Sequence, residues 1–375
     1  MNIVICPDKF KGSLNAREVC NAVSAGLRAV YPDARIESVP LADGGEGTCA
    51  LLTEWHQGHN IDIEVHGPLF TPVKARYGIS KEGDKAFIEM AQASGLTLIG
   101  PEKRNALMTT TLGTGEMIAD AINRKVKKVV LGIGGSATND AGIGMASALG
   151  YKFYDADGKI LKPTGENLIH IHQIKNNEVN PGLRHIRVVA LCDVTNPLYG
   201  PEGAAFVYGP QKGASQAAVE LLDAGLRNFE KVARTFLNMS SNFPGAGAAG
   251  GLGAGASVFL NAAMERGVVH IIETTALAEK IIHSDFVITG EGKIDKQTFS
   301  GKVVSEVLGI AKKAGKPVFV ICGICDVSEE EIKSRGIEKL ISLVDDGTSP
   351  ESAIQHAFSH ITRRIKDEFK RMPRY

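Results

Sequence analysis

The stretch from residue 127 to 144, KKVVLGIGGSATNDAGIG, constrains the fold of this chain more than any other. Its apolar residues at 129–133 predict a buried strand. The strand leads into the glycine-rich segment 134–140 and then into a helix-like segment, 141–149. A strand, a glycine turn and a helix in this order predict an anion site. Glycines let the backbone approach a ligand, and the start of a helix presents unpaired N–H groups with partial positive charge.

Glycine is unusually frequent, with 42 of 375 residues, about 11% against a typical 7%. The glycines gather between apolar runs, at 44–47, 132–135, 142–144, 245–255 and 290–292. This distribution is typical of an α/β enzyme whose loops approach a polyanionic ligand.

Charge and hydropathy exclude several classes of protein. Lysine plus arginine equals aspartate plus glutamate at 42 each, so no net field attracts nucleic acid or an anionic membrane surface. No apolar run reaches the roughly 20 residues that span a bilayer, and the N-terminus lacks the features of a signal peptide. Six scattered cysteines fit a reducing compartment. We expect a cytoplasmic protein with small-molecule substrates and no nucleic-acid or membrane partner. The sequence leaves open whether the protein is a monomer or a homodimer.

Strands and helices alternate at both ends of the chain. Strands are predicted at 2–6 and 35–39, and Asn15 with Glu18 has the spacing of a capping box at the start of the intervening helix. The same rhythm returns with strands at 284–289, 317–321 and 338–344. It predicts a doubly wound parallel sheet with ligands at the carboxyl ends of its strands.

The middle of the chain has another pattern. Residues 61–66, 73–79 and 85–90 alternate apolar with polar, as antiparallel strands do. We therefore expect a discontinuous first domain, 1–62 with 276–375, an inserted α/β domain over 63–275, and an active site in the cleft between them. Within the insertion, 245–255 is expected to be a flexible loop before a helix at 256–266.

Five predicted strands are followed by small residues and carboxylates, in the segments PDKFKGS, DGGEGT, GGSATND, CDVTNP and TGEGKID. Phosphoryl transfer needs phosphate donors, a divalent metal held by carboxylates and a group that positions the attacking hydroxyl. The candidate cations are Lys9, Lys11 and Lys293 in these loops and Lys212 in the segment GPQKGA. The loops supply carboxylates at Asp8, Asp43, Glu46, Asp140, Asp193, Glu291 and Asp295. No Walker A sequence, protein-kinase motif set or GxGxxG dinucleotide fingerprint accompanies them.

These residues divide into three expected roles, for which ATP and Mg²⁺ are the expected cofactors. Asp193 directly follows an apolar strand, so it is the candidate base. Lys11 and Asp8 are the other candidate catalytic residues. The candidate metal ligands are Asp140, Glu291, Asp295 and Asp43. The candidate phosphate- and substrate-binding residues are Lys9, Ser13, Gly134, Gly135, Ser136, Thr138, Asn139, Gly250, Gly251, Lys212 and Lys293. Which loop holds ATP stays open, and a turn or helix-cap role is the alternative for Asp8, Asp43, Glu291 and Asp295.

Taken in order, the motifs resemble those of the bacterial glycerate kinases. The resemblance rests on PDKFKGS (7–13), DGGEGT (43–48), EMAQASGL (89–96), GIGGSATNDAGIG (132–144), CDVTNPLYGPEGAA (192–205), GPQKGA (209–214), GAGAAGGLG (245–253) and TGEGKIDKQTFSGK (289–302). It implies ATP-dependent phosphorylation of D-glycerate on its 2-hydroxyl, giving 2-phosphoglycerate in glyoxylate or glucarate catabolism. It also implies a flavodoxin-like domain interrupted by a domain similar to restriction-endonuclease folds.

Three other functions compete with this one. In the first, the protein would still be a glycerate kinase but would phosphorylate the 3-hydroxyl, which gives a different product. A nicotinamide-dependent hydroxy-acid oxidoreductase could use 132–137 as its phosphate loop, although no acid follows at the usual distance. A non-catalytic binding protein for a sugar acid would bind without turnover, but the carboxylates in the loops would repel an anion unless a metal were present.

Overall fold

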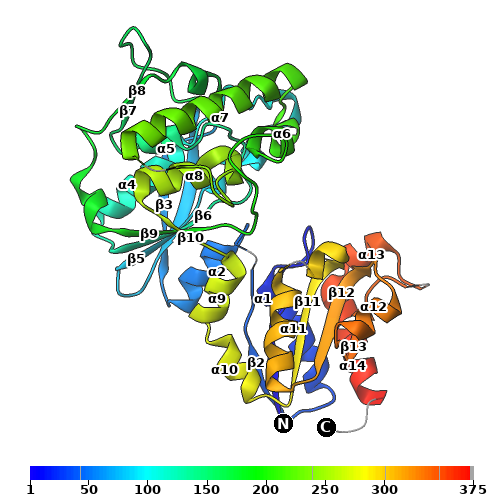
Figure 1. Ribbon diagram of the computed structural model, residues 1–375. Helices are drawn as coiled ribbons and strands as arrows, with labels where there is room; N and C mark the ends of the chain where they lie inside the picture. Colours follow the sequence, from blue (N-terminus) through cyan, green and yellow to red (C-terminus); the bar gives the residue numbers. More distant parts are fainter. Residues whose placement is uncertain (43, 239, 300, 346, 372–375) are drawn as a thin grey trace. The chain divides into compact units, whose positions relative to one another are not determined.

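The computed structural model describes residues 1–42, 44–238, 240–299, 301–345 and 347–371. It divides the chain into two compact units (Figure 1). The first combines Met1–Asp43 with Val268–Tyr375, and the second is the continuous segment Gly44–Gly267. The sequence analysis placed the boundaries later, at 62 and 275. Helix α2 (Thr48–Trp55) packs against strands of the second unit, so that unit includes residues before 62.

The first unit is built on a five-stranded sheet in which every neighbouring pair is parallel. Its strands are β1 (Asn2–Ile5), β2 (Arg35–Ser38), β11 (Phe286–Ile294), β12 (Val318–Cys325) and β13 (Lys339–Ser342). They lie in the order β13-β12-β11-β1-β2. Numbered within the unit this order is 2-1-3-4-5, that of flavodoxin-like doubly wound sheets.

Apolar side chains alternate between the two faces of this sheet, as the period of two in a strand requires. Ile3, Phe286 and Phe319 belong to the core cluster that includes α1 and α14, and the ring of Phe369 lies 4.9 Å from that of Phe319. The predicted capping box of Asn15 is confirmed at the start of α1. The helices of this unit are α1 (Ala16–Arg28), α9 (Gly267–Thr274), α10 (Leu277–Ile282), α11 (Val303–Ala314), α12 (Glu329–Ser334), α13 (Pro350–Gln355) and α14 (Ala357–Arg371).

The second unit contains a mixed six-stranded sheet in the order β10-β9-β6-β5-β4-β3. Strands β5, β6, β9 and β10 are parallel, whereas β3, β4 and β5 pair antiparallel, as the alternating pattern predicted. A separate antiparallel pair joins β7 to β8. The strands are β3 (His59–His66), β4 (Pro72–Ile79), β5 (Lys85–Glu89), β6 (Lys128–Gly132), β7 (Lys152–Tyr154), β8 (Gln173–Lys175), β9 (Arg187–Leu191) and β10 (Ala263–Glu265).

Two apolar clusters hold the second unit together. One lies between the sheet and helices α4, α5 and α8, and the other lies beneath the long helix α7, which Figure 1 shows outside that layer. Besides α2, the helices are α3 (Ala91–Ser94), α4 (Leu112–Asn123), α5 (Ile143–Ala148), α6 (Ala204–Tyr208), α7 (Gln216–Leu237) and α8 (Ala248–Leu260). The α/β architecture with parallel and mixed sheets agrees with the sequence analysis, and the likeness to restriction endonucleases stays a prediction.

Two glycine-rich segments differ from expectation. The segment expected as a flexible loop, 245–255, is largely part of α8, which is kinked where Ala249, Gly250 and Gly251 have positive φ. The helix expected at 256–266 therefore ends at Leu260, and β10 follows. The glycine turn expected at 290–295 is mostly strand, because β11 continues to Ile294 alongside β12.

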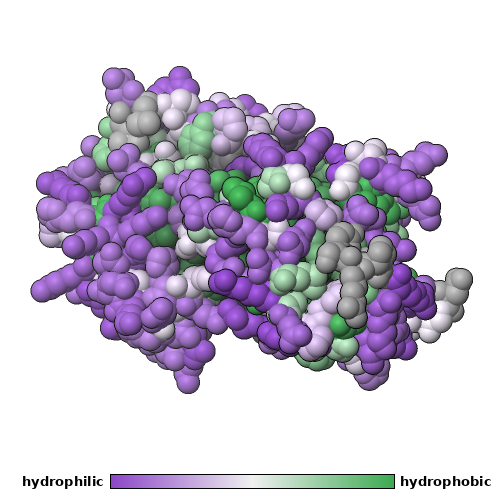
Figure 2. Space-filling model, turned by 90° about the horizontal axis from the view of Figure 1, so that it is seen from below, coloured by the Kyte–Doolittle hydropathy of each residue, from purple (hydrophilic) through white to green (hydrophobic). Residues whose placement is uncertain are grey.

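Within the described residues, no helix is long and apolar enough to cross a bilayer. Figure 2 shows one face of the molecule, on which hydrophilic side chains predominate and apolar ones form small, separate patches.

Candidate active site

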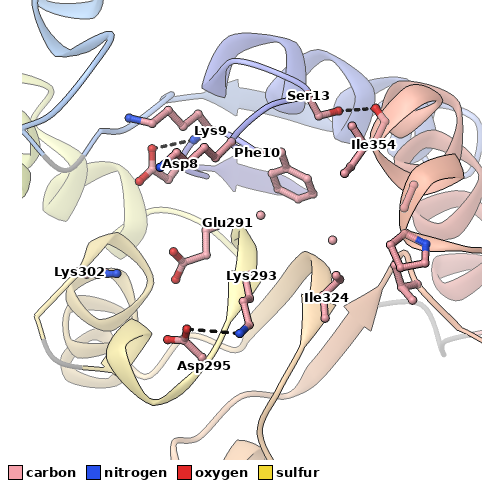
Figure 3. Close-up of a pocket in the computed structure, with 16 residues that line it drawn as sticks. Asp8, Lys9, Phe10, Ser13, Glu291, Lys293, Asp295, Lys302, Ile324 and Ile354 are labelled. Atoms are coloured by element: carbon pink, nitrogen blue, oxygen red, sulfur yellow. Dashed lines mark hydrogen bonds and ion pairs between the residues drawn. The ribbon is translucent and has the colours of Figure 1, made fainter. Parts of the chain in front are cut away.

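A pocket opens in the first unit at the carboxyl ends of β1 and β11 (Figure 3). At β1 the order of strand addition reverses, because β2 lies on one side and β11 on the other. Such a switch point leaves a crevice, since the chain leaves adjacent strands toward opposite faces. Beyond β1 the chain stays beside β11, where the N–H of Asp8 donates to the carbonyl of Gly290 at 2.8 Å. The cavity has a volume of about 430 Å³.

One part of the pocket wall is charged. Its lysines are Lys9, Lys11, Lys293 and Lys302, and its carboxylates are Asp8, Glu291 and Asp295. Asp8 is only 7% exposed, and its carboxylate accepts a hydrogen bond from the N–H of Lys9 at 2.7 Å. The Nζ of Lys293 lies 3.9 Å from Asp295 and 3.2 Å from Asp326. Four lysines against three lining carboxylates favour a polyanionic ligand.

The remaining wall is apolar. Phe10 and Ile354 lie close together across the pocket from Glu291 and Asp295, and Ile324 lies below them in the view of Figure 3. The hydroxyl of Ser13 donates to the carbonyl of Ile354 at 2.7 Å, which ties the loop after β1 to α13. That hydroxyl proton is therefore already used, although Ser13 was predicted to bind phosphate.

This pocket brings together seven of the predicted site residues, from two segments far apart in the chain. They are Asp8, Lys9, Lys11, Ser13, Glu291, Lys293 and Asp295. Sequence reasoning missed Lys302, which lines the same pocket. Its signal was present in the last motif, where this lysine immediately precedes α11.

The segment GGSATND, a second candidate site, lies at the carboxyl end of β6 in the second unit. Its tip, Gly134 and Gly135, is exposed, whereas residues 136–140 are buried. The N–H of Leu96 donates to the carbonyl of Gly135, and the N–H of Ala137 donates to the carbonyl of Ser94. Backbone hydrogen bonds to residues 94–96 of the same chain thus hold the loop in place. The exposed glycine tip is the part of this loop that can meet an anion with its backbone.

Lys212 supports this loop from below. Its side chain was predicted to bind phosphate directly, but the residue is 2% exposed, and its Nζ donates at 2.7 Å to both the Ser136 hydroxyl and the Thr138 carbonyl. Burial lowers the pKa of Lys212 to about 7, although the nearby Asp140 acts in the opposite direction. Lys212 therefore fixes the shape of the loop and places a titratable charge beneath it.

Asp140 is likewise fully buried. Its carboxylate accepts hydrogen bonds from the N–H and the hydroxyl of Thr111, each at 2.8 Å, and from the N–H groups of Gly142 and Gly144. Burial raises its pKa, and these hydrogen bonds act against that rise. Asp140 was a candidate metal ligand, but here its oxygens are occupied in joining the start of α4 to the start of α5. Sequence reasoning gave Thr111 no role, although it lies in the run of threonines before α4.

Asn139 and Thr138 are buried in the same loop. The Asn139 amide atoms and the Thr138 hydroxyl have no hydrogen-bond partner among the described residues. Buried polar groups nearly always have a partner, so we expect bound water at these two side chains.

Gly250 and Gly251 lie behind the loop rather than at its tip. A Cβ at Gly250 would lie 2.0 Å from the carbonyl oxygen of Thr138, and one at Gly251 would lie 3.0 Å from the Cα of Ala141. Both glycines have positive φ and are buried. They were predicted to cradle phosphate, but packing against the backbone of the loop accounts for both.

Asp193 follows β9 and is exposed. Its carboxylate lies in a space that two glycines leave open: a Cβ at Gly44 would lie 2.7 Å from the Asp193 Oδ2, and one at Gly267 would lie 3.0 Å from it. The chain at Gly44 and at the start of α9 thus approaches this carboxylate closely. Asp43 lies outside the described residues, and the adjoining Glu46 is exposed.

Glu89 is a buried carboxylate that sequence reasoning left without a role. It ends β5, is 7% exposed and accepts a hydrogen bond from the N–H of Cys49 at 2.9 Å, in the first turn of α2. A carboxylate at a helix start satisfies otherwise unpaired N–H groups. The signal was its position at the end of an apolar strand in the motif EMAQASGL.

The comparisons with known proteins agree with each other over the whole length. The model of the glycerate kinase family matches residues 3–372. The chain is 43% identical to a glycerate kinase of Halalkalibacterium halodurans, with 97% of this chain and 96% of that protein covered. It is also 43% identical to the glycerate 2-kinase of Escherichia coli K12, covering 98% and 97%.

A solved structure extends the agreement to the fold. A crystal structure from Salmonella typhimurium LT2, provisionally assigned as glycerate kinase 2, is 40% identical and superposes with a TM-score of 0.87 over 98% of this chain and 97% of that one. The chain belongs to the glycerate kinase family. The prediction that the chain is a kinase is thereby confirmed.

Proposed function

We propose that this enzyme transfers the γ-phosphoryl group of ATP to the 2-hydroxyl of D-glycerate, giving 2-phosphoglycerate and ADP in organic-acid catabolism such as that of glyoxylate or glucarate. The observation that carries the proposal is the pocket at the switch point, where lysines and carboxylates line one wall. The identity to the Escherichia coli glycerate 2-kinase supports the choice of acceptor hydroxyl.

Mg²⁺ is part of the proposal. Among the described residues no three histidine, cysteine or acidic side chains are grouped to hold a metal by themselves. Mg²⁺ usually takes one or two carboxylates, water and substrate phosphates, so the carboxylates beside the pocket lysines fit that mode. One or two of the carboxylates of Asp8, Glu291 and Asp295 would hold the ion, which neutralises phosphate charge when it is bound.

Three groups of residues have separate roles in this reaction. Lys9, Lys11, Lys293 and Lys302 stabilise negative charge on the phosphoryl oxygens. Asp193 accepts the proton of the attacking hydroxyl, as an exposed carboxylate held between glycine backbones is suited to do. The backbone at Gly134 and Gly135 binds an anionic group of a substrate.

The first test of this proposal is a change at Asp193. Asp193→Asn keeps the size of the side chain but removes the proton acceptor, so we expect kcat to fall about 10²–10⁴-fold while ADP binding stays unchanged. The measurement is ADP release with Mg·ATP and D-glycerate, with calorimetry for ADP binding. Asp367→Asn, on the exposed side of α14, is the matched control and should keep its rate. A fully active Asp193→Asn enzyme would exclude Asp193 as the base.

A further inference from the structure

The apolar wall of the switch-point pocket is not explained by phosphate or glycerate. Ile324 and Ile354 are large apolar side chains that stay 38% and 52% exposed, and both line this one cavity. Phe10, which is buried, closes the space beside them (Figure 3). A three-carbon hydroxy acid carries polar groups on every carbon and would gain little from contact with these side chains.

Between the two walls the pocket is lined by the backbone of Gly292 and Gly323, which have no side chains. These glycines also let neighbouring backbone segments approach each other closely. A Cβ at Gly323 would lie 2.6 Å from the carbonyl oxygen of Gly292, and one at Gly292 would lie 3.2 Å from the N of Lys11. The pocket therefore runs from apolar side chains across exposed backbone to the lysines. Its volume of about 430 Å³ exceeds what a three-carbon acid fills and lies within the range of pockets for larger ligands, about 300–1,000 Å³.

We propose that this pocket binds the nucleoside triphosphate, with the base against Phe10, Ile324 and Ile354 and the phosphates beside the pocket lysines. A nucleotide joins an apolar, flat base to a polyanion, and the two walls match these parts in chemistry. The position agrees with the rule that ligands of doubly wound sheets bind where the strand order reverses. The inference rests on the proposed function, since it assigns one of that reaction's two substrates to this pocket.

The experiment changes the apolar wall without touching a charged residue. In Ile354→Asp a half-exposed apolar side chain becomes an anion at the place of the base. Ile282→Asp makes the same change at the end of α10, outside the pocket, where the side chain is 53% exposed against 52% for Ile354. The full-length proteins are compared by calorimetric binding of ADP and by the KM values for ATP and for D-glycerate. Ile354→Ala is a milder second variant, and thermal unfolding checks that each variant is folded.

For Ile354→Asp we expect the Kd of ADP and the KM of ATP to rise at least about tenfold, with the KM of D-glycerate unchanged. Ile354→Ala should raise the same two constants less, and Ile282→Asp should leave all three within about twofold. A rise in the KM of D-glycerate alone would assign the pocket to the acid and overturn the proposal. Constants that do not change in either Ile354 variant would show that the apolar wall binds neither substrate and would overturn it as well.

The same data separate this inference from the proposed function. A wild-type protein that binds ADP in an Ile354-dependent way but transfers no phosphoryl group to D-glycerate would refute the reaction and leave the nucleotide pocket standing. Phosphoryl transfer to D-glycerate with a Kd of ADP and a KM of ATP that do not change in the Ile354 variants would support the reaction and refute the nucleotide pocket.

Discussion

At the scale of single residues, the most informative side chain is Lys212. A lysine this deeply buried is costly in its charged form, and its two hydrogen bonds to the GGSATND loop offset only part of that cost. The sequence marked Lys212 as a phosphate ligand because it lies in a glycine-rich loop. It could not show that the side chain turns inward, since burial is decided by packing between segments more than 70 residues apart.

The lowered pKa of Lys212 makes a prediction about stability. The unfolded chain binds this proton up to about pH 10.4, whereas the folded protein releases it near pH 7. Stability therefore rises with pH between these two values, because the unfolded state holds more protons there. Replacing Lys212 by Met removes this dependence. From pH 7 to pH 9, the unfolding free energy of the wild type should rise by about 2 kcal/mol relative to that of Lys212→Met.

Urea unfolding followed by the fluorescence of Trp55 provides the measurement. This is the only tryptophan of the sequence, and it ends α2 in the second unit, which also contains Lys212. Parallel pH curves for the two proteins would show that Lys212 stays charged in the folded state and would contradict the argument.

At the scale of elements, the apolar runs predicted the strands well. The strands expected at 2–6, 35–39 and 129–133 are β1, β2 and β6, with ends shifted by one residue. Buried strands are specified by their own side chains, so their pattern is visible in the sequence. The glycine-rich segments were predicted less well, because glycine fits a loop, a kinked helix or a strand edge, and the neighbouring backbone decides among these.

The kink in α8 shows this dependence on neighbours and makes a prediction. In Gly250→Ala the new methyl group would lie 2.0 Å from the Thr138 carbonyl oxygen, at a φ of +69°. We expect a loss of about 3 kcal/mol in the unfolding free energy of the second unit, from the clash and the left-handed backbone together. Gly158→Ala is the matched control, since Gly158 has a φ of +77° with nothing within 4 Å. It should lose only about 1 kcal/mol.

Trp55 fluorescence in urea measures both variants, because both glycines belong to the second unit. Equal losses in the two variants would mean that backbone conformation alone requires Gly250, and that its contact with the loop contributes nothing.

At the scale of the whole molecule, two compact units each have their own sheet and core, and the second is one continuous segment placed between the two parts of the first. The interrupted alternation of strands and helices predicted this order, because parallel and antiparallel sheets have different hydropathy patterns. The family was predictable for another reason. Its motifs are spread in a fixed order along nearly the entire chain, so together they are specific where each alone is weak.

Individual roles were harder to predict. A carboxylate that the sequence places after a strand can line a pocket, as Glu291 does, or be buried in a hydrogen-bond network, as Asp140 is. The two residues have similar settings in sequence. They differ in which chain segments fold over them, and only the three-dimensional structure shows that.

The proposed phosphorylation of D-glycerate on its 2-hydroxyl is tested by identifying the product. The purified protein is incubated with Mg·ATP and D-glycerate, and the reaction is followed by ³¹P NMR with authentic 2- and 3-phosphoglycerate as standards. We predict a single new phosphomonoester signal that coincides with 2-phosphoglycerate and grows as ADP appears. A signal at 3-phosphoglycerate would refute transfer to the 2-hydroxyl, and ATP that stays intact in the presence of the acid would refute the reaction.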